Sequence, residues 1–154
     1  MIKSILLENF RGLKQIELLE VQQLTLISGK NNSGKSSILE GILLMIDHIS
    51  PDSFVKMNYF RNMTISYNQN SLWNCLFYNL DTKLSLRFFM ELDNNQSAHL
   101  EYQRDDSFIL AEKTMPSQEI INSFLPFEKS NYALKFKFIY EKYKEEGHFS
   151  INSS

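Results

Sequence analysis

The first twenty residues carry the pattern of a β-hairpin. Residues 2–10 are rich in apolar side chains, and from Lys14 to Glu20 apolar and polar residues alternate with a period of two. Such alternation is typical of a strand with one buried and one exposed face. Between the two runs, Gly12 is free to take the positive φ angle of a tight turn. We therefore predict two paired strands joined at Asn9-Phe10-Arg11-Gly12.

A short strand, a loop and a helix are predicted next. Leu24-Thr25-Leu26-Ile27-Ser28 is an apolar, partly β-branched run that ends at a glycine, which favours a buried strand. From Ser36 to Ile49 the apolar residues follow helical spacing and form one broad face. Pro51 is predicted to stop this helix soon after Ser50. The apolar positions of the helix are Ile38, Leu39, Ile42, Leu43, Met45, Ile46 and Ile49.

The middle of the chain has a weaker pattern. Residues 51–70 are polar with scattered aromatic side chains and predict a short helix or an irregular loop. Residues 71–80 carry apolar side chains, among them Trp73 and Leu76, at the spacing of one amphipathic helical face, which predicts core packing. A further short helix is predicted at residues 119–124.

From Asp81 the pattern changes to short apolar runs separated by turn-forming residues. Successive strands with short turns imply an antiparallel meander. Residues 135–138 place lysines on one side of a strand and phenylalanines on the other. The charge run at 141–146 is expected to be a solvated end, and residues 148–151 to start one more strand. The predicted strands of the meander are 83–92, 98–104, 108–113 and 132–140.

Composition indicates one folded domain, and the predicted strands and helices together give it an α/β (α+β mixed) class. The chain has 154 residues, of which 43% are hydrophobic and 22% are charged, and its net charge of −2 gives no global reason to expect nucleic acid binding. The single cysteine, Cys75, excludes an internal disulfide and a multi-cysteine metal site, and it is interpreted as a small buried hydrophobe. Because no signal peptide or membrane-spanning run is found, we expect a cytoplasmic protein with no membrane partner.

The candidate chemistry lies between the predicted strand and helix. Gly29-Lys30-Asn31-Asn32-Ser33-Gly34-Lys35-Ser36 fits G-x-x-x-x-G-K-[ST], a loop whose backbone amides surround phosphates. In such loops the lysine reaches the terminal phosphates and the hydroxyl binds Mg²⁺, so the motif predicts ATP and Mg²⁺ as cofactors. Asn32 stands where glycine is common, and asparagine tolerates a positive φ angle. A coincidental turn is disfavoured because strand, loop, lysine, hydroxyl and helix all agree.

Two motifs together resemble a known family. The first motif is Phe10-Arg11-Gly12-Leu13, and the second is the phosphate loop with its continuation Ser37-Ile38-Leu39-Glu40-Gly41-Ile42. The first motif shortly before the second is similar to the pattern of ABC-type ATPases of the RecF, SMC and OLD group. The match is closest to bacterial AAA family ATPases of OLD type, and it covers about the first fifty residues. Residues 76–81 resemble a Leu-Phe-Tyr segment of such proteins more weakly.

The resemblance implies a fold and a set of site residues. It implies a P-loop NTPase N-terminal lobe over residues 1–154, a single partial ATPase domain. Within it, residues 1–50 hold the hairpin, Walker A loop and helix, 51–80 a helical or irregular segment, and 81–154 a β-rich subdomain. By resemblance the nucleotide would be bound by Gly29, Asn31, Asn32, Ser33, Gly34, Lys35, Ser36, Ser37 and Arg11, with Ser36 also the Mg²⁺ ligand. Arg61 resembles the arginine of a loop after the first helix in SMC and RecF proteins.

The chain departs from these ATPases in its catalytic motifs. They need a Walker B strand ending in Asp-Glu and a Ser-Gly-Gly type signature, and neither is found in this sequence. The nearest strings, Phe88-Phe89-Met90-Glu91 and Phe138-Ile139-Tyr140-Glu141, lack the aspartate and are interpreted as ordinary strands. No residue is therefore assigned a catalytic role, and this chain alone is expected to bind nucleotide weakly and to hydrolyse it poorly.

Three functions remain open from the sequence. The first is the ATP-binding N-terminal lobe of a longer or split OLD-type ATPase from a DNA-repair or phage-defence system. Such a lobe would act as a homodimer or with a complementary C-terminal ATPase lobe, and would meet nucleic acid through the complete complex. The second is a catalytically inactive regulatory or interaction protein that keeps the fold. A kinase-type enzyme ranks last, because a hairpin and a meander do not suit a plain doubly wound sheet.

Overall fold

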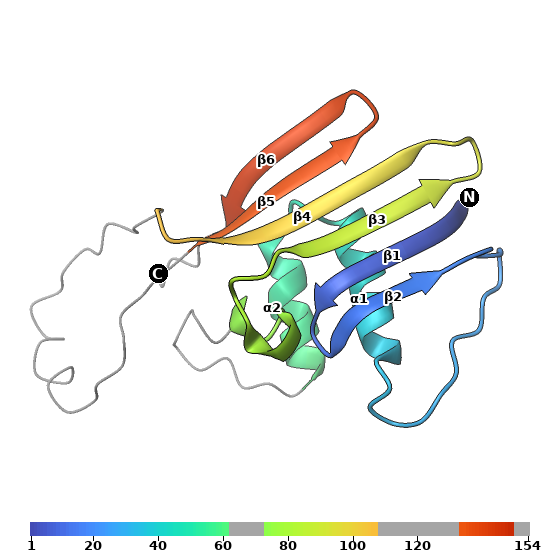
Figure 1. Ribbon diagram of the computed structural model, residues 1–154, viewed down its shortest axis with the longest axis horizontal. Helices are drawn as coiled ribbons and strands as arrows, with labels where there is room; N and C mark the ends of the chain where they lie inside the picture. The colour runs from blue at the N-terminus through green and yellow to red at the C-terminus, as the bar shows by residue number, and fades with distance from the viewer. Residues whose placement is uncertain (62–72, 108–132, 150–154) are drawn as a thin grey trace, which may run out of the picture.

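The protein is built on one antiparallel sheet that is covered by helices on one face. The computed structural model describes residues 1–61, 73–107 and 133–149. Within these residues six strands lie in the order β2-β1-β3-β4-β5-β6, and every neighbouring pair is antiparallel (Figure 1). The strands are β1 (Ile2–Phe10), β2 (Leu13–Leu18), β3 (Leu86–Leu92), β4 (Ser97–Asp105), β5 (Ala133–Tyr140) and β6 (Tyr143–Phe149).

The helices occupy the connection between β2 and β3. These are α1 (Lys35–Ile46), α2 (Pro51–Phe60) and the short 3₁₀ helix η1 (Tyr78–Leu80). In Figure 1, α1 and α2 lie together on one side of the sheet. Alternate strand residues face them and are buried, which is the pattern of a sheet with one covered face. Fully buried examples are Leu7, Phe10, Leu86, Phe88, Leu100 and Tyr102.

Close packing between α1 and β1 depends on a glycine. A Cβ atom added at Gly41 would lie 2.8 Å from Cδ1 of Leu7, a side chain with no exposed surface. The neighbouring α1 residues Ile38, Leu44 and Met45 are buried as well. Because Gly41 has no side chain, the middle of α1 can approach β1 closely.

The opposite face of the sheet carries a row of alternating charges. Glu8, Arg87, Glu101, Lys137 and Glu146 are successive cross-strand partners from β1 through β3, β4 and β5 to β6. One pair is in direct contact, with Arg87 Nε donating to Glu101 Oε1 at 3.3 Å. Opposite charges on directly facing positions stabilise a register, since a shift of the strands by one residue would remove every pair.

Several predicted elements are confirmed. The first strand has the predicted bounds, the second lies at Leu13–Leu18, and β3, β4 and β5 lie where strands of the antiparallel meander were predicted. Phe136 and Phe138 are buried, and the two lysines beside them are on the other face. Of the two alternatives for residues 51–70, a short helix or an irregular loop, the first ten residues form the helix α2. The expectations for residues 62–70, 108–113 and 119–124 lie outside the described residues.

The predicted strand at 24–28 is wrong. The structure has no strand there, and Leu24 and Leu26 are 90% and 89% exposed. A strand needs a neighbour to pair with its backbone groups, and none of the described strands pairs with this segment. An apolar run alone is therefore not enough to form the element.

Other boundaries differ from the sequence predictions for local reasons. Helix α1 ends at Ile46 rather than Ile49, and Pro51 begins α2 instead of stopping α1, because proline is favoured at the first helical position. The 73–80 stretch is mostly turn and 3₁₀ rather than one amphipathic helix, although Trp73, Leu76 and Phe77 are buried as predicted. The charge run at 141–146 is not a solvated end, since most of it belongs to β6.

Candidate functional site

The loop at residues 29–34 is an exposed turn that leads directly into α1. Gly34, the residue before the helix, has φ 89° and ψ 4°, a left-handed conformation that favours glycine. Asn32 also has a positive φ angle of 64°, as the sequence predicted for an asparagine at this place. The N-terminus of α1 has no side-chain cap. Its first amides therefore lack the partner that a cap supplies, and they form the positive end of the helix dipole.

Lys35 lies folded back across this loop. Its ammonium donates hydrogen bonds to the backbone oxygens of Gly29, at 2.8 Å, and of Lys30, at 2.6 Å. These acceptors are neutral, so they hold the ammonium in place without cancelling its charge. The arrangement keeps a full positive charge within the loop, close to the uncapped end of α1.

The two serines after Lys35 face different environments. Ser36 is exposed, whereas Ser37 is only 4% exposed. The hydroxyl of Ser37 accepts a hydrogen bond from Nη2 of Arg61 at 3.1 Å. Ser36 is thus accessible to a ligand in solution, while Ser37 connects the first turn of α1 to the end of α2.

Arg11 is held in the β1–β2 turn in an unusual conformation. The positive φ angles of this turn belong to Asn9, at 57°, and Arg11, at 53°, and not to Gly12, contrary to the sequence prediction. The strain is offset by anchoring, since the amide of Arg11 donates to the carbonyl oxygen of Leu76 at 2.7 Å and its Nη2 to Oδ1 of Asn58 at 3.0 Å. Burial lowers the pKa of the Arg11 guanidinium, and the neighbouring carboxylate of Glu40 opposes that shift.

Glu40 joins the two arginines. Its Oε2 lies 2.5 Å from Nε of Arg11, which makes a close ion pair. Its Oε1 accepts from Nε of Arg61 at 2.7 Å, and its Oε2 accepts from Nη2 of Arg61 at 3.2 Å. We call these three residues the Arg11–Glu40–Arg61 cluster. The structure therefore brings both predicted arginines to the first turns of α1.

The sequence interpretation did not assign a role to Glu40 or to Asn58. A signal for Glu40 was present, because it is the one charged residue in α1 after Lys35 and lies three residues from Ser37, on the same helical face. Asn58 gave no comparable signal. It is 2% exposed, and its importance depends on a contact with a residue 47 positions away.

The strings nearest to a Walker B motif are structural strands. Phe88 and Met90 in β3, and Phe138 in β5, are buried in the core. Oε1 of Glu91 lies 3.1 Å from Nζ of Lys3 on the neighbouring strand, so this carboxylate serves the sheet. Glu141 lies in the turn between β5 and β6.

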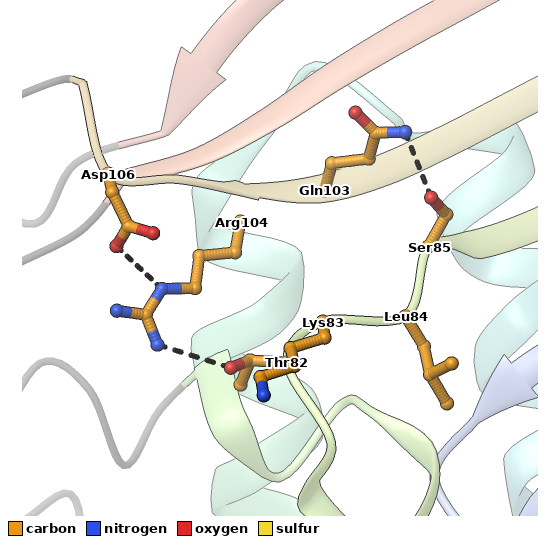
Figure 2. A pocket seen from close by; sticks show the side chains of 7 residues that line it. All are labelled: Thr82, Lys83, Leu84, Ser85, Gln103, Arg104 and Asp106. Carbon is orange, nitrogen blue, oxygen red and sulfur yellow. Dashed lines mark hydrogen bonds and ion pairs between the residues drawn. The ribbon is translucent and has the colours of Figure 1, made fainter.

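A polar pocket lies away from the phosphate loop, where β3 begins beside β4 (Figure 2). Its side chains are largely paired with one another. Arg104 Nε is 2.6 Å from Oδ1 of Asp106, Arg104 Nη1 donates to Thr82 Oγ1 at 3.2 Å, and Gln103 Nε2 donates to Ser85 Oγ at 2.9 Å. These contacts fasten the entry of β3 to the end of β4, so we assign them a structural role. The pocket is lined by Thr82, Lys83, Leu84, Ser85, Gln103, Arg104 and Asp106.

Comparison with known proteins finds a matching family and two relatives. A family model described as an AAA ATPase domain matches residues 1–153. A Helicobacter pylori protein named ATP/GTP phosphatase is 28% identical over 148 residues, which make up 95% of this chain and 38% of that protein. An uncharacterized protein of Methanocaldococcus jannaschii is 46% identical over 46 residues, or 30% of this chain and 21% of that protein. The chain therefore spans well under half the length of these relatives. Within the described residues, no helix is both long and apolar enough to cross a membrane.

Proposed function

Because the chain belongs to the AAA ATPase domain family, we propose that its loop at residues 29–34 and the start of α1 bind the triphosphate of ATP. The observation that carries the proposal is the uncapped N-terminus of α1, which follows a left-handed Gly34 and has the Lys35 ammonium held across the loop. Uncapped helix amides and a nearby cation are the two features that a phosphate group needs.

Each residue of the loop then has a distinct role. The amides of residues 31–36 would surround the α and β phosphates, and Lys35 would leave the loop carbonyls for the β and γ phosphates. The exposed hydroxyl of Ser36 fits Mg²⁺, which commonly keeps water and phosphate oxygens as its other ligands. Mg²⁺ at this place would neutralise phosphate charge.

We further propose that this domain works as part of a larger OLD-type assembly. The apolar residues Leu39, Leu43 and Ile46 lie at positions i, i+4 and i+7 of α1, and all three are exposed, although the opposite face of the helix is buried on the sheet. A helix that is apolar on all sides is normally covered on all sides. A C-terminal ATPase lobe or a second copy would cover this face and the exposed Leu24 and Leu26. The complete protein would then hydrolyse nucleoside triphosphates and act in DNA repair or antiviral defence.

Nucleotide titration tests the binding proposal. Wild-type protein, Lys35→Ala and Lys30→Ala would each be titrated with fluorescent ATP in the presence and absence of Mg²⁺. We expect Lys35→Ala to lose binding and Lys30→Ala to keep it, because the Lys30 backbone carbonyl, not its side chain, contacts Lys35. Equal binding by wild type and Lys35→Ala would refute the proposal.

A second candidate function rests on the missing Walker B aspartate-glutamate pair. The chain would then be an interaction protein that binds nucleotide without turnover and regulates a full-length relative through its exposed apolar face. Mixing the chain with a full-length relative distinguishes the two functions. A complex with lowered ATPase rate favours regulation, whereas no complex and an unchanged rate exclude it.

A further inference from the structure

The Arg11–Glu40–Arg61 cluster has more positive than negative charge. Two guanidinium groups share one carboxylate, which leaves a formal charge of about +1 at a mostly buried place. The side chains of Arg11 and Glu40 are 6% and 13% exposed. Both cations also lie beside the first turns of α1, the positive end of its dipole, where a cation is disfavoured. An unbalanced positive charge here is suited to an anion.

Arg61 is the member of the cluster that solvent can reach, with a side chain 34% exposed. Glu40 and Ser37 together engage its Nε and Nη2 atoms. A guanidinium carries five N–H donors in a fixed plane, and the hydrogen bonds of Arg61 to the described residues use Nε and Nη2 and not Nη1. Two donors of known orientation therefore remain beside the turn that carries Ser36 and Ser37.

We propose that Glu40 is a positioning residue for nucleotide binding, which holds the guanidinium of Arg61 against Ser37 so that its free Nη1 donors meet the bound phosphates. The inference rests on the proposed nucleotide site at residues 29–37. Glu40 itself contacts no phosphate in this account. It acts through Arg61, while its second contact, to the buried Arg11, keeps the carboxylate from turning away.

A competing account makes the cluster a structural tie only. Glu40 connects α1 to the β1–β2 turn through Arg11 and to the end of α2 through Arg61. Under that account, removing the Glu40 charge would lower stability, and folded protein would bind ATP as tightly as wild type. The folded Glu40 variant would even bind ATP more tightly than wild type, because one negative charge near the phosphates is removed. The two accounts thus predict opposite changes in affinity.

A double-mutant cycle separates them. ATP affinity is measured with Mg²⁺ for wild type, Glu40→Gln, Arg61→Ala and the double variant, each with a thermal unfolding curve to establish that it is folded. We expect each single variant to bind about tenfold more weakly, the worth of one charge-assisted hydrogen bond, and the double variant to bind no more weakly than Arg61→Ala. Unchanged or tighter ATP binding by Glu40→Gln overturns the proposal. The proposal is also overturned if Glu40→Gln lowers ATP affinity by the same factor in the Arg61→Ala protein as in the wild type.

A further variant covers the case in which Glu40→Gln does not fold. Arg61→Lys keeps the positive charge and its attraction to Glu40 but lacks the planar donors. We expect it to bind ATP about tenfold more weakly, close to Arg61→Ala, and wild-type affinity would overturn the proposal. Lys35→Ala distinguishes an error in the role of Glu40 from an error in the proposed nucleotide site. If Lys35→Ala abolishes binding while the Glu40 and Arg61 variants do not change it, the loop binds nucleotide and only the role of Glu40 is wrong.

Discussion

Two apolar runs in this chain have similar composition and opposite fates. Strand β1 lies between β2 and β3, and its residues Ile5 and Leu7 are 1% and 0% exposed. Residues 24–28 also have the pattern of a strand in the sequence, yet they form no strand, and Leu24 and Leu26 are exposed. The difference is not in the residues but in what surrounds them, because backbone pairing and burial both need a second element.

The loop at residues 29–34 has a defined turn conformation next to the unpaired segment. Its conformation depends on neighbours in the sequence, namely the left-handed Gly34, the positive φ of Asn32 and the contacts of Lys35 with loop carbonyls. Local geometry of this kind does not need a paired strand. The comparison therefore predicts that substitutions in the sheet core lower the free energy of unfolding strongly, and that substitutions in residues 24–28 change it little.

The largest loss of stability is expected for Phe88→Ala. Phe88 has no exposed surface, and its ring lies 5.2 Å from that of Phe10 in an edge-to-face contact. Truncation leaves a cavity between the sheet and the helices and should lower the free energy of unfolding by about 3–5 kcal/mol. Urea denaturation followed by circular dichroism measures it. A loss below about 1 kcal/mol would mean that this core is not packed as described.

A smaller loss is expected for Gly41→Ala. The new methyl group would meet the Leu7 side chain, which is enclosed and cannot move away, so the free energy of unfolding should fall by about 1–3 kcal/mol. The same denaturation experiment applies. Combining it with Leu7→Ala should recover part of the loss, since the clash is removed. Simple addition of the two effects would show that α1 and β1 are not in close contact.

Gly34→Ala is expected to act mainly on the loop. Alanine at φ 89° is strained by about 1–2 kcal/mol, and the turn into α1 would shift to relieve it. ATP binding should fall with only a modest decrease in thermal stability. Gly12→Ala is the matched control, because its φ is not positive and nothing lies within 4 Å of an added Cβ. Equal effects of the two variants would contradict the assigned conformations.

The smallest effect is expected for Leu26→Asn. This side chain is almost fully exposed, so the free energy of unfolding of the chain should change by no more than about 0.5 kcal/mol. Self-association, measured by analytical ultracentrifugation, should fall because an exposed apolar residue is removed. A large loss of stability would show that residues 24–28 are buried in solution.

Much of the architecture was predictable because it depends on local pattern. The hairpin strands, the start of α1, the meander and the positive φ of Asn32 follow from periodicity, turn chemistry and residue type within short windows. Strand β6 was not predicted, because its charges are typical of a solvated segment. Such charges suit an edge strand equally well, and only the pairing of this segment with β5 distinguishes an edge strand from a solvated segment.

What the sequence by itself determined is the turn at residues 29–34 and the helix that follows it, since their conformation depends on adjacent residues. Tertiary structure alone decided that Arg11, rather than Gly12, takes the left-handed conformation, and that Glu40 joins two arginines from different elements. It also decided that residues 24–28 form no strand. These outcomes depend on contacts between residues far apart in the chain, which no local pattern contains.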